Sequence, residues 1–235
     1  KIYSDFDGTI TKEDTVNKFF ELFADDKWTY YENLWINGKI SSRENAINQV
    51  NLIKPVSEKE LNDYINSIEL DEYFINFTKY LEKNKIELII LSDGFDLFIK
   101  KILEKNKINN IKFYANHLIY KDKKFSIEFP YFNSNCQKGA GMCKCNKIPE
   151  TDFCYIGDGT SDLCIAKKAK ILFATKSLKD YCKKNFCFIF FSEYIAYFNS
   201  GTGNCKCRDA DNNHGDNGIE QFGYADEKAD GNAGE

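Results

Sequence analysis

Continuous apolar runs alternate along the chain with runs that have helical spacing. Residues 86–91 are apolar at nearly every position, as in a strand covered on both faces of a parallel sheet, and residues 153–157 repeat this character. Shorter apolar runs predict further strands at 2–3, 111–115, 171–173 and 188–191, and a hairpin over 118–128. Helices are expected over 95–106 and from Ser161 and Ser177 onward, with Ser161 as an N-cap. This alternation predicts an α/β fold, a Rossmann-like doubly wound parallel sheet.

A helical block separates the first predicted strand from the second. Residues 11–82 have helical spacing and no strand pattern. Ser41 and Ser57 are expected to be N-caps, and Glu60 completes a capping box with Ser57. We therefore expect four or five helices that form a cap inserted into the α/β core. The predicted boundaries are 12–82 for the cap and 1–11 plus 83–198 for the core.

Composition limits the partners of this fold. The chain has 235 residues, a formal net charge of -4 and no block of Lys or Arg, which argues against a nucleic-acid partner. No run reaches the ~18 apolar residues of a membrane-spanning helix, and acids at positions 5 and 7 interrupt any leader. We therefore expect a cytoplasmic protein with no membrane partner. Residues 199–235 hold eight acids, three bases and seven of the 14 Gly, which predicts a disordered acidic tail.

The nine cysteines are expected to be reduced thiols that mostly pack as small hydrophobic side chains. Two C-x-C pairs, Cys143 with Cys145 and Cys205 with Cys207, leave a four-cysteine metal site as an alternative. The chain has only two histidines, which argues against a His-centred triad or a multi-His metal site.

Three polar clusters follow predicted strands, at the edge of the sheet where doubly wound folds bind ligands. Asp5 and Asp7 follow the first strand, residues 92–94 follow the second, and Asp158 and Asp162 follow a later one. Crowded carboxylates repel one another unless a cation compensates them. An all-oxygen set without His or Cys favours Mg²⁺.

The same edge offers groups that bind an anion. The Ser92 hydroxyl, the Gly94 amide and the N-terminus of the following helix can together receive a phosphoryl oxygen. Mg²⁺ that is held by few protein groups commonly engages substrate phosphate. Carboxylates, magnesium and an anion cradle together predict phosphoryl transfer.

Four motifs, in this order, resemble those of the haloacid dehalogenase superfamily. They are Asp5-Phe6-Asp7-Gly8-Thr9-Ile10, Ser92-Asp93-Gly94-Phe95, a downstream lysine, and Gly157-Asp158-Gly159-Thr160-Ser161-Asp162. The helical insert between the first two motifs is similar to that of the phosphoserine-phosphatase-like branch, subfamily IB, which has a C1-type cap. The segment with Phe129-Pro130-Tyr131, Cys136 and Gly141-Met142-Cys143-Lys144 further resembles the phosphoethanolamine/phosphocholine phosphatases and the methylthio-ketopentenyl phosphate phosphatases of methionine salvage.

The resemblance implies a role for each motif residue. Asp5 would be the nucleophile that becomes an aspartyl phosphate. Asp7 would protonate the leaving alkoxide and then activate water. Ser92 would bind a phosphoryl oxygen, and Lys144 would neutralise charge on nucleophile and phosphate. Lys138 is the alternative to Lys144, because the spacing to the last motif is short.

The metal and substrate contacts are implied in the same way. Asp158 would coordinate Mg²⁺ together with Asp5 and the Asp7 carbonyl, and Asp162 would hold the metal directly or through water. The candidate substrate contacts beyond Ser92 and Lys144 are Thr9, Asp14, Arg43, Asp93 and Gly94.

These candidate contacts differ in what they would bind. Asp14 would meet a substrate amine and Arg43 a carboxylate. The Gly94 amide would assist Ser92, and Asp93 is alternatively a solvated loop acid. Residues 12–80 carry 13 acids and eight bases, which favours a monoester with a cationic end.

The resemblance therefore implies a Mg²⁺-dependent phosphatase that hydrolyses a small phosphorylated metabolite through an aspartyl phosphate. One alternative is a phosphotransferase that uses the same residues. Another is a non-catalytic binding protein that retains the fold and recruits a basic partner through its acidic tail.

Overall fold

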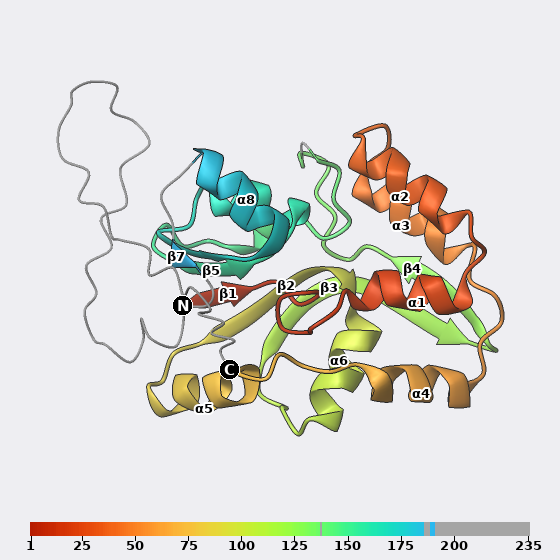
Figure 1. Cartoon of the computed structure of the whole chain (residues 1–235), viewed down its shortest axis with the longest axis horizontal. Helices are drawn as coiled ribbons and strands as arrows, with labels where there is room; N and C mark the ends of the chain where they lie inside the picture. The colour runs from red at the N-terminus through yellow and green to blue at the C-terminus, as the bar shows by residue number, and fades with distance from the viewer. Residues whose placement is uncertain (137, 186–188, 191–235) are drawn as a thin grey trace, which may run out of the picture.

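The computed structural model describes residues 1–136, 138–185 and 189–190 (Figure 1). The acidic segment 199–235, which contains Cys205 and Cys207, lies outside these described residues. The expected disorder of this segment and a metal site formed by the two cysteine pairs therefore stay predictions.

A seven-stranded sheet forms the centre of the described part of the chain. The strands lie in the order β4-β3-β2-β1-β5-β6-β7, and every neighbouring pair is parallel except β3 with β4. Strand β1 is thus central, with β2 on one side and β5 on the other. The bounds are β1 (Ile2–Ser4), β2 (Leu88–Phe95), β3 (Lys112–Lys121), β4 (Lys124–Glu128), β5 (Cys154–Gly157), β6 (Ile171–Ala174) and β7 (Ile189–Phe190). The doubly wound α/β fold predicted from the sequence is confirmed.

The central strands are buried on both faces, which explains their continuous apolar runs. In β2, Leu88 and Ile90 belong to one hydrophobic cluster, whereas Ile89 and Leu91 belong to a second. Strands β1, β5 and β6 divide their residues between the two clusters in the same alternating way. Since successive side chains of a strand point to opposite faces, one cluster covers each side of the sheet.

Helices cover both faces of the sheet (Figure 1). The first cluster receives Phe19 from α1, Tyr64 from α4, Phe77 from α5 and Phe98 from α6, so the helical block shares this core with the sheet. The second cluster receives side chains from α7 and α8. The bounds are α1 (Thr15–Phe23), α2 (Trp28–Ile36), α3 (Ser42–Val50), α4 (Glu58–Ser67), α5 (Phe74–Lys83), α6 (Asp96–Lys105), α7 (Leu163–Ala166) and α8 (Lys176–Asn185).

Helices α2 and α3 differ from the other helices of the block, because they stand beyond the edge of the sheet (Figure 1). They pack against each other, and α3 also contacts β4. The predicted caps hold them and their neighbours in place. Ser41 caps α3 and Ser57 caps α4, each in a full capping box, with Glu44 and Glu60 as the partners. Five helices lie between β1 and β2, where the sequence predicts four or five.

The prediction that Ser161 is an N-cap is wrong. Ser161 lies inside a short 3₁₀ helix, η2 (Thr160–Asp162), and α7 begins only after it. The Asp162 carboxylate accepts the amides of Asp158 and Gly159, which closes the chain into this tighter turn.

The strand expected at 111–115 and the hairpin expected over 118–128 are both observed, but they are not separate, because β3 runs on without a break into the hairpin with β4.

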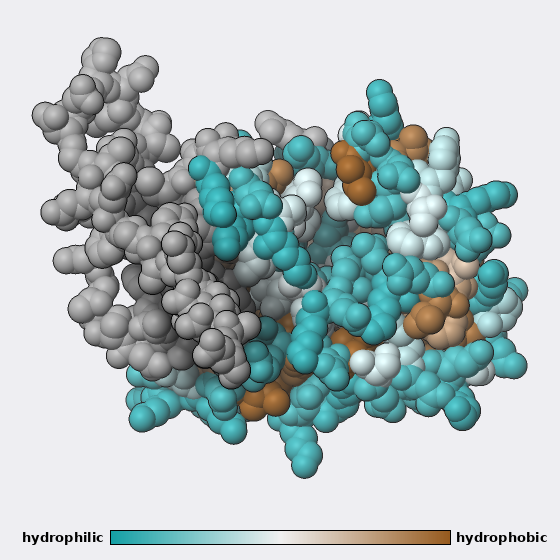
Figure 2. All heavy atoms as spheres, viewed as in Figure 1, coloured by the Kyte–Doolittle hydropathy of each residue, from teal (hydrophilic) through white to brown (hydrophobic). Residues whose placement is uncertain are grey.

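Within the described residues, no helix has the length and apolar character needed to cross a membrane. Figure 2 shows a face that is mainly hydrophilic, with hydrophobic residues in small separate groups. Scattered apolar residues of this kind are normal on a protein surface.

Candidate active site

Three loops meet at the carboxyl ends of β1, β2 and β5. Asp5 follows β1 directly, and its amide donates to the Ile156 carbonyl of β5 at 2.8 Å. Residues 92–94 lie at the irregular end of β2, where the pairing with β3 shifts register, and Asp158 follows β5. Because β1 lies between β2 and β5, this is the point where the strand order reverses, the usual ligand site of open α/β sheets.

The carboxylates of Asp5, Asp158 and Asp162 form a cluster suited to a cation. One carboxylate oxygen of each lies within 4.8 Å of the other two. Burial raises the pKa of Asp5 well above its usual value, and the charge of Asp162 raises it further. Burial also raises the pKa of Asp158. Crowded carboxylates of this kind need a positive charge, and oxygen ligands suit a hard divalent ion.

Lys144 is buried and supplies one positive charge to this cluster. It begins the 3₁₀ helix η1 (Lys144–Lys147), and its Nζ lies 2.8 Å from Asp5 Oδ2 and 2.6 Å from Asp162 Oδ1. Burial lowers the pKa of Lys144, but the two carboxylates outweigh this effect and raise it above its usual value. Lys138, the alternative from the sequence, is exposed and lies outside these contacts. The structure thus brings Lys144 to the predicted place.

Asp162 is fully buried, and protein groups occupy both of its carboxylate oxygens. Lys144 and the Tyr155 hydroxyl donate to Oδ1, the latter at 2.5 Å. The amides of Asp158 and Gly159 both donate to Oδ2 at 3.1 Å. Asp162 therefore orients Lys144 and the loop that carries Asp158.

The Asp7 carboxylate lies between the sheet and helix α1. The Thr15 amide donates to Asp7 Oδ1 at 3.3 Å, and the Thr15 hydroxyl donates to the same oxygen. The Ser92 hydroxyl donates to Asp7 Oδ2 at 2.9 Å and accepts the Gly94 amide at 2.8 Å. Burial raises the pKa of Asp7, although the hydrogen bonds from Thr15 and Ser92 oppose the rise. A carboxyl with a raised pKa keeps its proton to higher pH, as a general acid requires.

Asp158 is held by two residues outside the cleft. The Thr9 hydroxyl donates to Asp158 Oδ1 at 3.2 Å, and Lys176 Nζ lies 3.0 Å from Oδ2. Lys176 Nζ also donates to the Gly8 carbonyl at 2.6 Å. The structure therefore places Thr9, a predicted substrate contact, against Asp158, a predicted metal ligand.

Asp93 joins three parts of the chain. Its carboxylate accepts the Ser42 hydroxyl of α3, the Asn116 side chain of β3 at 3.1 Å, and the Met142 amide at 2.8 Å. Asp93 borders the cleft, yet both carboxylate oxygens are occupied by protein donors. The alternative of a solvated loop acid is wrong, because Asp93 lies within β2 and its carboxylate is bonded to these protein donors.

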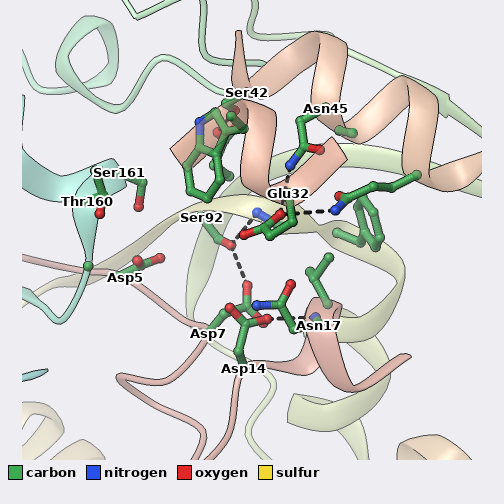
Figure 3. Close-up of a pocket in the computed structure, with 18 of the residues that line it drawn as sticks. Asp5, Asp7, Asp14, Asn17, Glu32, Ser42, Asn45, Ser92, Thr160 and Ser161 are labelled. Carbon is green, nitrogen blue, oxygen red and sulfur yellow. Dashed lines mark hydrogen bonds between the residues drawn. The ribbon is translucent and has the colours of Figure 1, made fainter. Parts of the chain in front are cut away.

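A cleft opens above Asp5 and Asp7 and is roofed by α2 and α3 (Figure 3). Glu32 of α2 faces into it, with its Oε2 accepting Asn45 at 2.9 Å and Gln49 at 3.0 Å. Asp14, the N-cap of α1, lies at the floor of the cleft and accepts the Asn17 amide. Partial desolvation by the walls of the cleft and the nearby charge of Asp7 raise the pKa of Asp14 to about 7, although the residue is exposed at its outer side. Trp35 supplies an aromatic wall.

Arg43, the other predicted substrate contact in the cap, is not brought into this cleft. Its guanidinium carbon lies 5.1 Å from the ring centre of Phe129 and 4.8 Å from that of Phe132. Arg43 lines a second cavity, formed with α3 and β4. Among the described residues that line the main cleft there is no Lys or Arg side chain.

Several site residues were not found from the sequence. Thr15, Tyr155 and Lys176 hold the predicted carboxylates, and Glu32 lines the cleft. Tyr155 offered one usable signal, since a polar hydroxyl inside a buried apolar strand needs a partner. The others depend on contacts between distant segments and follow no sequence spacing.

Known proteins are similar to this chain over most of its described length. Residues 2–167 match the model of a family described as haloacid dehalogenase-like hydrolase. A protein of Bacillus pumilus named 2-hydroxy-3-keto-5-methylthiopentenyl-1-phosphate phosphatase is 33% identical over 187 residues, which cover 77% of this chain and 80% of that protein.

Solved structures share the fold. A substrate-bound phosphoserine phosphatase complex matches with a TM-score of 0.59 and 24% identity over 83% of this chain and 96% of its own. A phospho-aspartyl intermediate analogue of phosphoserine phosphatase matches with a TM-score of 0.60 and 23% identity, over 83% of this chain and 97% of its own. At these identities the likeness concerns the fold.

Proposed function

The chain belongs to the haloacid dehalogenase-like hydrolase family, and from this membership we propose that it hydrolyses a small phosphomonoester through an aspartyl phosphate on Asp5. The observation that carries the proposal is the pairing of buried Asp5 with buried Lys144, next to a separately held Asp7 at the floor of one cleft. A nucleophile, a cation and a second carboxyl group are the parts that this reaction needs.

The proposed first step transfers the phosphoryl group to Asp5. A carboxylate oxygen of Asp5 attacks phosphorus, and the bond from phosphorus to the substrate oxygen breaks. Asp7 donates its proton to the leaving alkoxide, which its raised pKa favours. Lys144 offsets negative charge on the phosphoryl group, and the Ser92 hydroxyl turns from Asp7 to donate to a phosphoryl oxygen.

The second step releases phosphate. Asp7, now a carboxylate, takes a proton from water, and the water oxygen attacks phosphorus of the aspartyl phosphate. The bond between phosphorus and Asp5 breaks, so that inorganic phosphate leaves and both carboxyl groups return to their first state. Thr15 keeps Asp7 in one orientation through both steps.

The donors at this edge fit Mg²⁺. Asp5, Asp158 and the Asp7 carbonyl would hold the ion, with Asp162 in contact directly or through water. The raised pKa values of Asp5 and Asp158 support this assignment, because burial and the neighbouring charge of Asp162 make their ionised forms costly and Lys144 offsets this cost only in part. When bound, Mg²⁺ supplies positive charge to a phosphoryl oxygen.

The cleft guides the choice of substrate. A phosphorylated amino acid would need a cation for its carboxylate, and the described cleft lining supplies no Lys or Arg. Side-chain amide groups of Asn17 and Asn45 suit hydroxyl and keto oxygens, while Trp35 suits an apolar end. We propose 2-hydroxy-3-keto-5-methylthiopentenyl-1-phosphate, the substrate in the name of the Bacillus pumilus relative, ahead of phosphoserine. An amine-bearing monoester is the second candidate, because Asp14 and Glu32 face the same space.

The test is hydrolysis of p-nitrophenyl phosphate with Mg²⁺. It is followed by hydrolysis of the keto-pentenyl phosphate, of an amine-bearing monoester and of phosphoserine. Asp5→Asn should lower kcat on the order of 10³-fold or more, as expected for loss of a nucleophile. Asp152→Asn is the control, since Asp152 is an exposed carboxylate paired with Lys170. An inactive wild type, or an Asp5→Asn variant with full activity, would overturn the proposal. A preference for phosphoserine would overturn the substrate choice alone.

A further inference from the structure

We propose that Cys145 and Cys164 are a site of oxidative modification, where a reversible disulfide forms beside Lys144 and slows the enzyme. The two thiols come from different elements, Cys145 from η1 and Cys164 from α7. Their sulfur atoms lie 2.8 Å apart. The effect on turnover rests on the proposed function, whereas the chemistry of the two thiols does not.

The distance favours a bond. A disulfide has a sulfur to sulfur length of about 2.05 Å, so closure requires the two sulfur atoms to approach by less than about 1 Å. Short elements carry both cysteines, which allows an adjustment of this size: η1 spans Lys144–Lys147 and α7 spans Leu163–Ala166. Both side chains are half-buried, so a small oxidant can reach them.

The other described cysteines differ from this pair. All six described cysteines are free thiols. Cys154 and Cys182 are buried in the two hydrophobic clusters, where they fill space. Cys143 is buried and lies beside Cys136, and this pair is the competing site for a disulfide.

The place of the pair in the fold gives the modification its effect. Cys145 follows Lys144 in the chain, and Cys164 lies two residues after Asp162. Lys144 and Asp162 form the buried ion pair of 2.6 Å that sets the position of the lysine. A disulfide would tie the backbones of η1 and α7 together behind this ion pair. The strain of closure would shift Lys144 relative to Asp5, its partner in the proposed reaction.

The oxidant is a hydroperoxide such as hydrogen peroxide. One cysteine thiolate attacks a peroxide oxygen, the O–O bond breaks, and hydroxide leaves as water after protonation, giving a sulfenic acid. The second thiol then attacks that sulfur, the S–O bond breaks, and a second water leaves. In total, two thiols and one hydrogen peroxide give one disulfide and two waters. A dithiol reductant reverses the change.

The experiment maps the thiols of the full chain after treatment with hydrogen peroxide and blocking of free thiols. The protein is then digested so that each cysteine lies in its own peptide. Trypsin cleaves after Lys144, between Cys143 and Cys145, and chymotrypsin cleaves after Tyr155, between Cys154 and Cys164. We expect a peptide pair linked through Cys145 and Cys164. Hydrolysis of p-nitrophenyl phosphate should fall by about tenfold, within the range of a catalytic group displaced by less than 1 Å, and dithiothreitol should restore it.

Variants separate this site from general oxidation. Cys145→Ser and Cys164→Ser should keep the turnover of the reduced enzyme and lose its sensitivity to peroxide. Cys182→Ser is the matched control, because Cys182 is buried and contacts no other cysteine within the described part of the chain, and this variant should stay sensitive. Absence of the linked peptides, linkage of Cys136 to Cys143 instead, or unchanged turnover of the linked form would each overturn the proposal. A reduced wild type without activity would instead refute the proposed function, and the peptide map would still decide whether the two thiols bond.

Discussion

Gly94 sets the room that is available to the proposed general acid. A methyl group on Gly94 would overlap Asp7 Oδ2 and would lie 3.0 Å from Ser92 Oγ. Asp7 is hydrogen-bonded through both oxygens, so a displacement breaks its contacts with Thr15 or Ser92. We expect Gly94→Ala to lower kcat by about 100-fold, as a 1 Å displacement of a catalytic group can. Steady-state kinetics with p-nitrophenyl phosphate measures this change.

Gly159→Ala is the matched control for this substitution. No heavy atom lies within 4 Å of the methyl group that it would add, and the amide that donates to Asp162 is kept. Its kcat should stay close to that of the wild type. An equal loss in both variants, or none in Gly94→Ala, would contradict the steric explanation.

Asp14 should make recognition of a cationic substrate depend on pH. Its pKa is raised to about 7, so the carboxyl is mostly neutral at about pH 6 and mostly charged at about pH 8. We therefore expect the KM of phosphoethanolamine to fall over this range relative to the KM of glycerol phosphate, which has no amine. Asp14→Asn should remove the difference. A KM ratio that is constant with pH in the wild type would refute this role.

The sequence predicts the position of a site residue when that residue directly follows a strand. Asp5 and Asp158 follow β1 and β5, so the topology of the sheet alone brings them together. Thr15 and Glu32 depend on how helices pack over that edge, a contact between segments that no spacing encodes. Arg43 was expected at the substrate, but its flat guanidinium stacks with two aromatic rings that the sequence places about 90 residues away.

At the scale of elements, Asp93 connects α3, β3 and the segment that leads to Lys144. Its carboxylate accepts Ser42, Asn116 and the amide of Met142, two residues before Lys144. In Asp93→Asn, an amide nitrogen would face one of these donors in place of an acceptor, which leaves that donor unpaired. We expect kcat to fall about tenfold or more, through displacement of Lys144.

The comparison with Ser42→Ala identifies the contact responsible. That variant removes only the link to α3, so it should alter KM more than kcat. Asp63→Asn is the control, since Asp63 is an exposed carboxylate paired with Lys59. A kcat of Asp93→Asn equal to that of the control would show that the Met142 contact does not position the lysine.

Elements were predictable where local signals determine them. The capping boxes at Ser41 and Ser57 are formed within four residues, and both helix starts were placed correctly. The start of α7 was predicted at Ser161, before its observed position. An acid in the first turn is common in helices, so the sequence does not show that Asp162 ends a separate 3₁₀ turn. Its carboxylate instead closes the 3₁₀ turn and binds Tyr155 and Lys144, and this depends on a buried network across the fold.

At the scale of the whole molecule, the strand order explains why one site gathers so many acids. Strand β1 lies between β2 and β5, so the loops after all three strands open into the same cleft. The continuous apolar runs predicted the layers, since a strand that is apolar throughout has to be covered on both faces, and the two hydrophobic clusters cover them. The position of α2 and α3 over the cleft was not predictable, because it depends on packing against the distant strand β4.

The gathered acids should make the stability of the metal-free protein fall as pH rises. The pKa values of Asp5, Asp14 and Asp158 are all raised in the folded state above the value of 3.8 that an unfolded chain would have. The folded state therefore binds protons more tightly than the unfolded state, and this stabilisation is lost as pH rises through the raised pKa values. Thermal unfolding in EDTA should show a lower Tm at pH 8 than at pH 6, two values that span the pKa of about 7 of Asp14.

Added Mg²⁺ should reverse this trend, because it binds the charged carboxylates of the folded state only. We expect its stabilising effect to be larger at pH 8 than at pH 6, where protons compete for the same oxygens. Asp5→Asn removes one negative charge from the cluster, so in EDTA at pH 8 it should be more stable than the wild type and should gain less from Mg²⁺. A Tm that rises with pH in EDTA, or an equal response of both proteins to Mg²⁺, would refute the view that repulsion among these carboxylates is what the metal relieves.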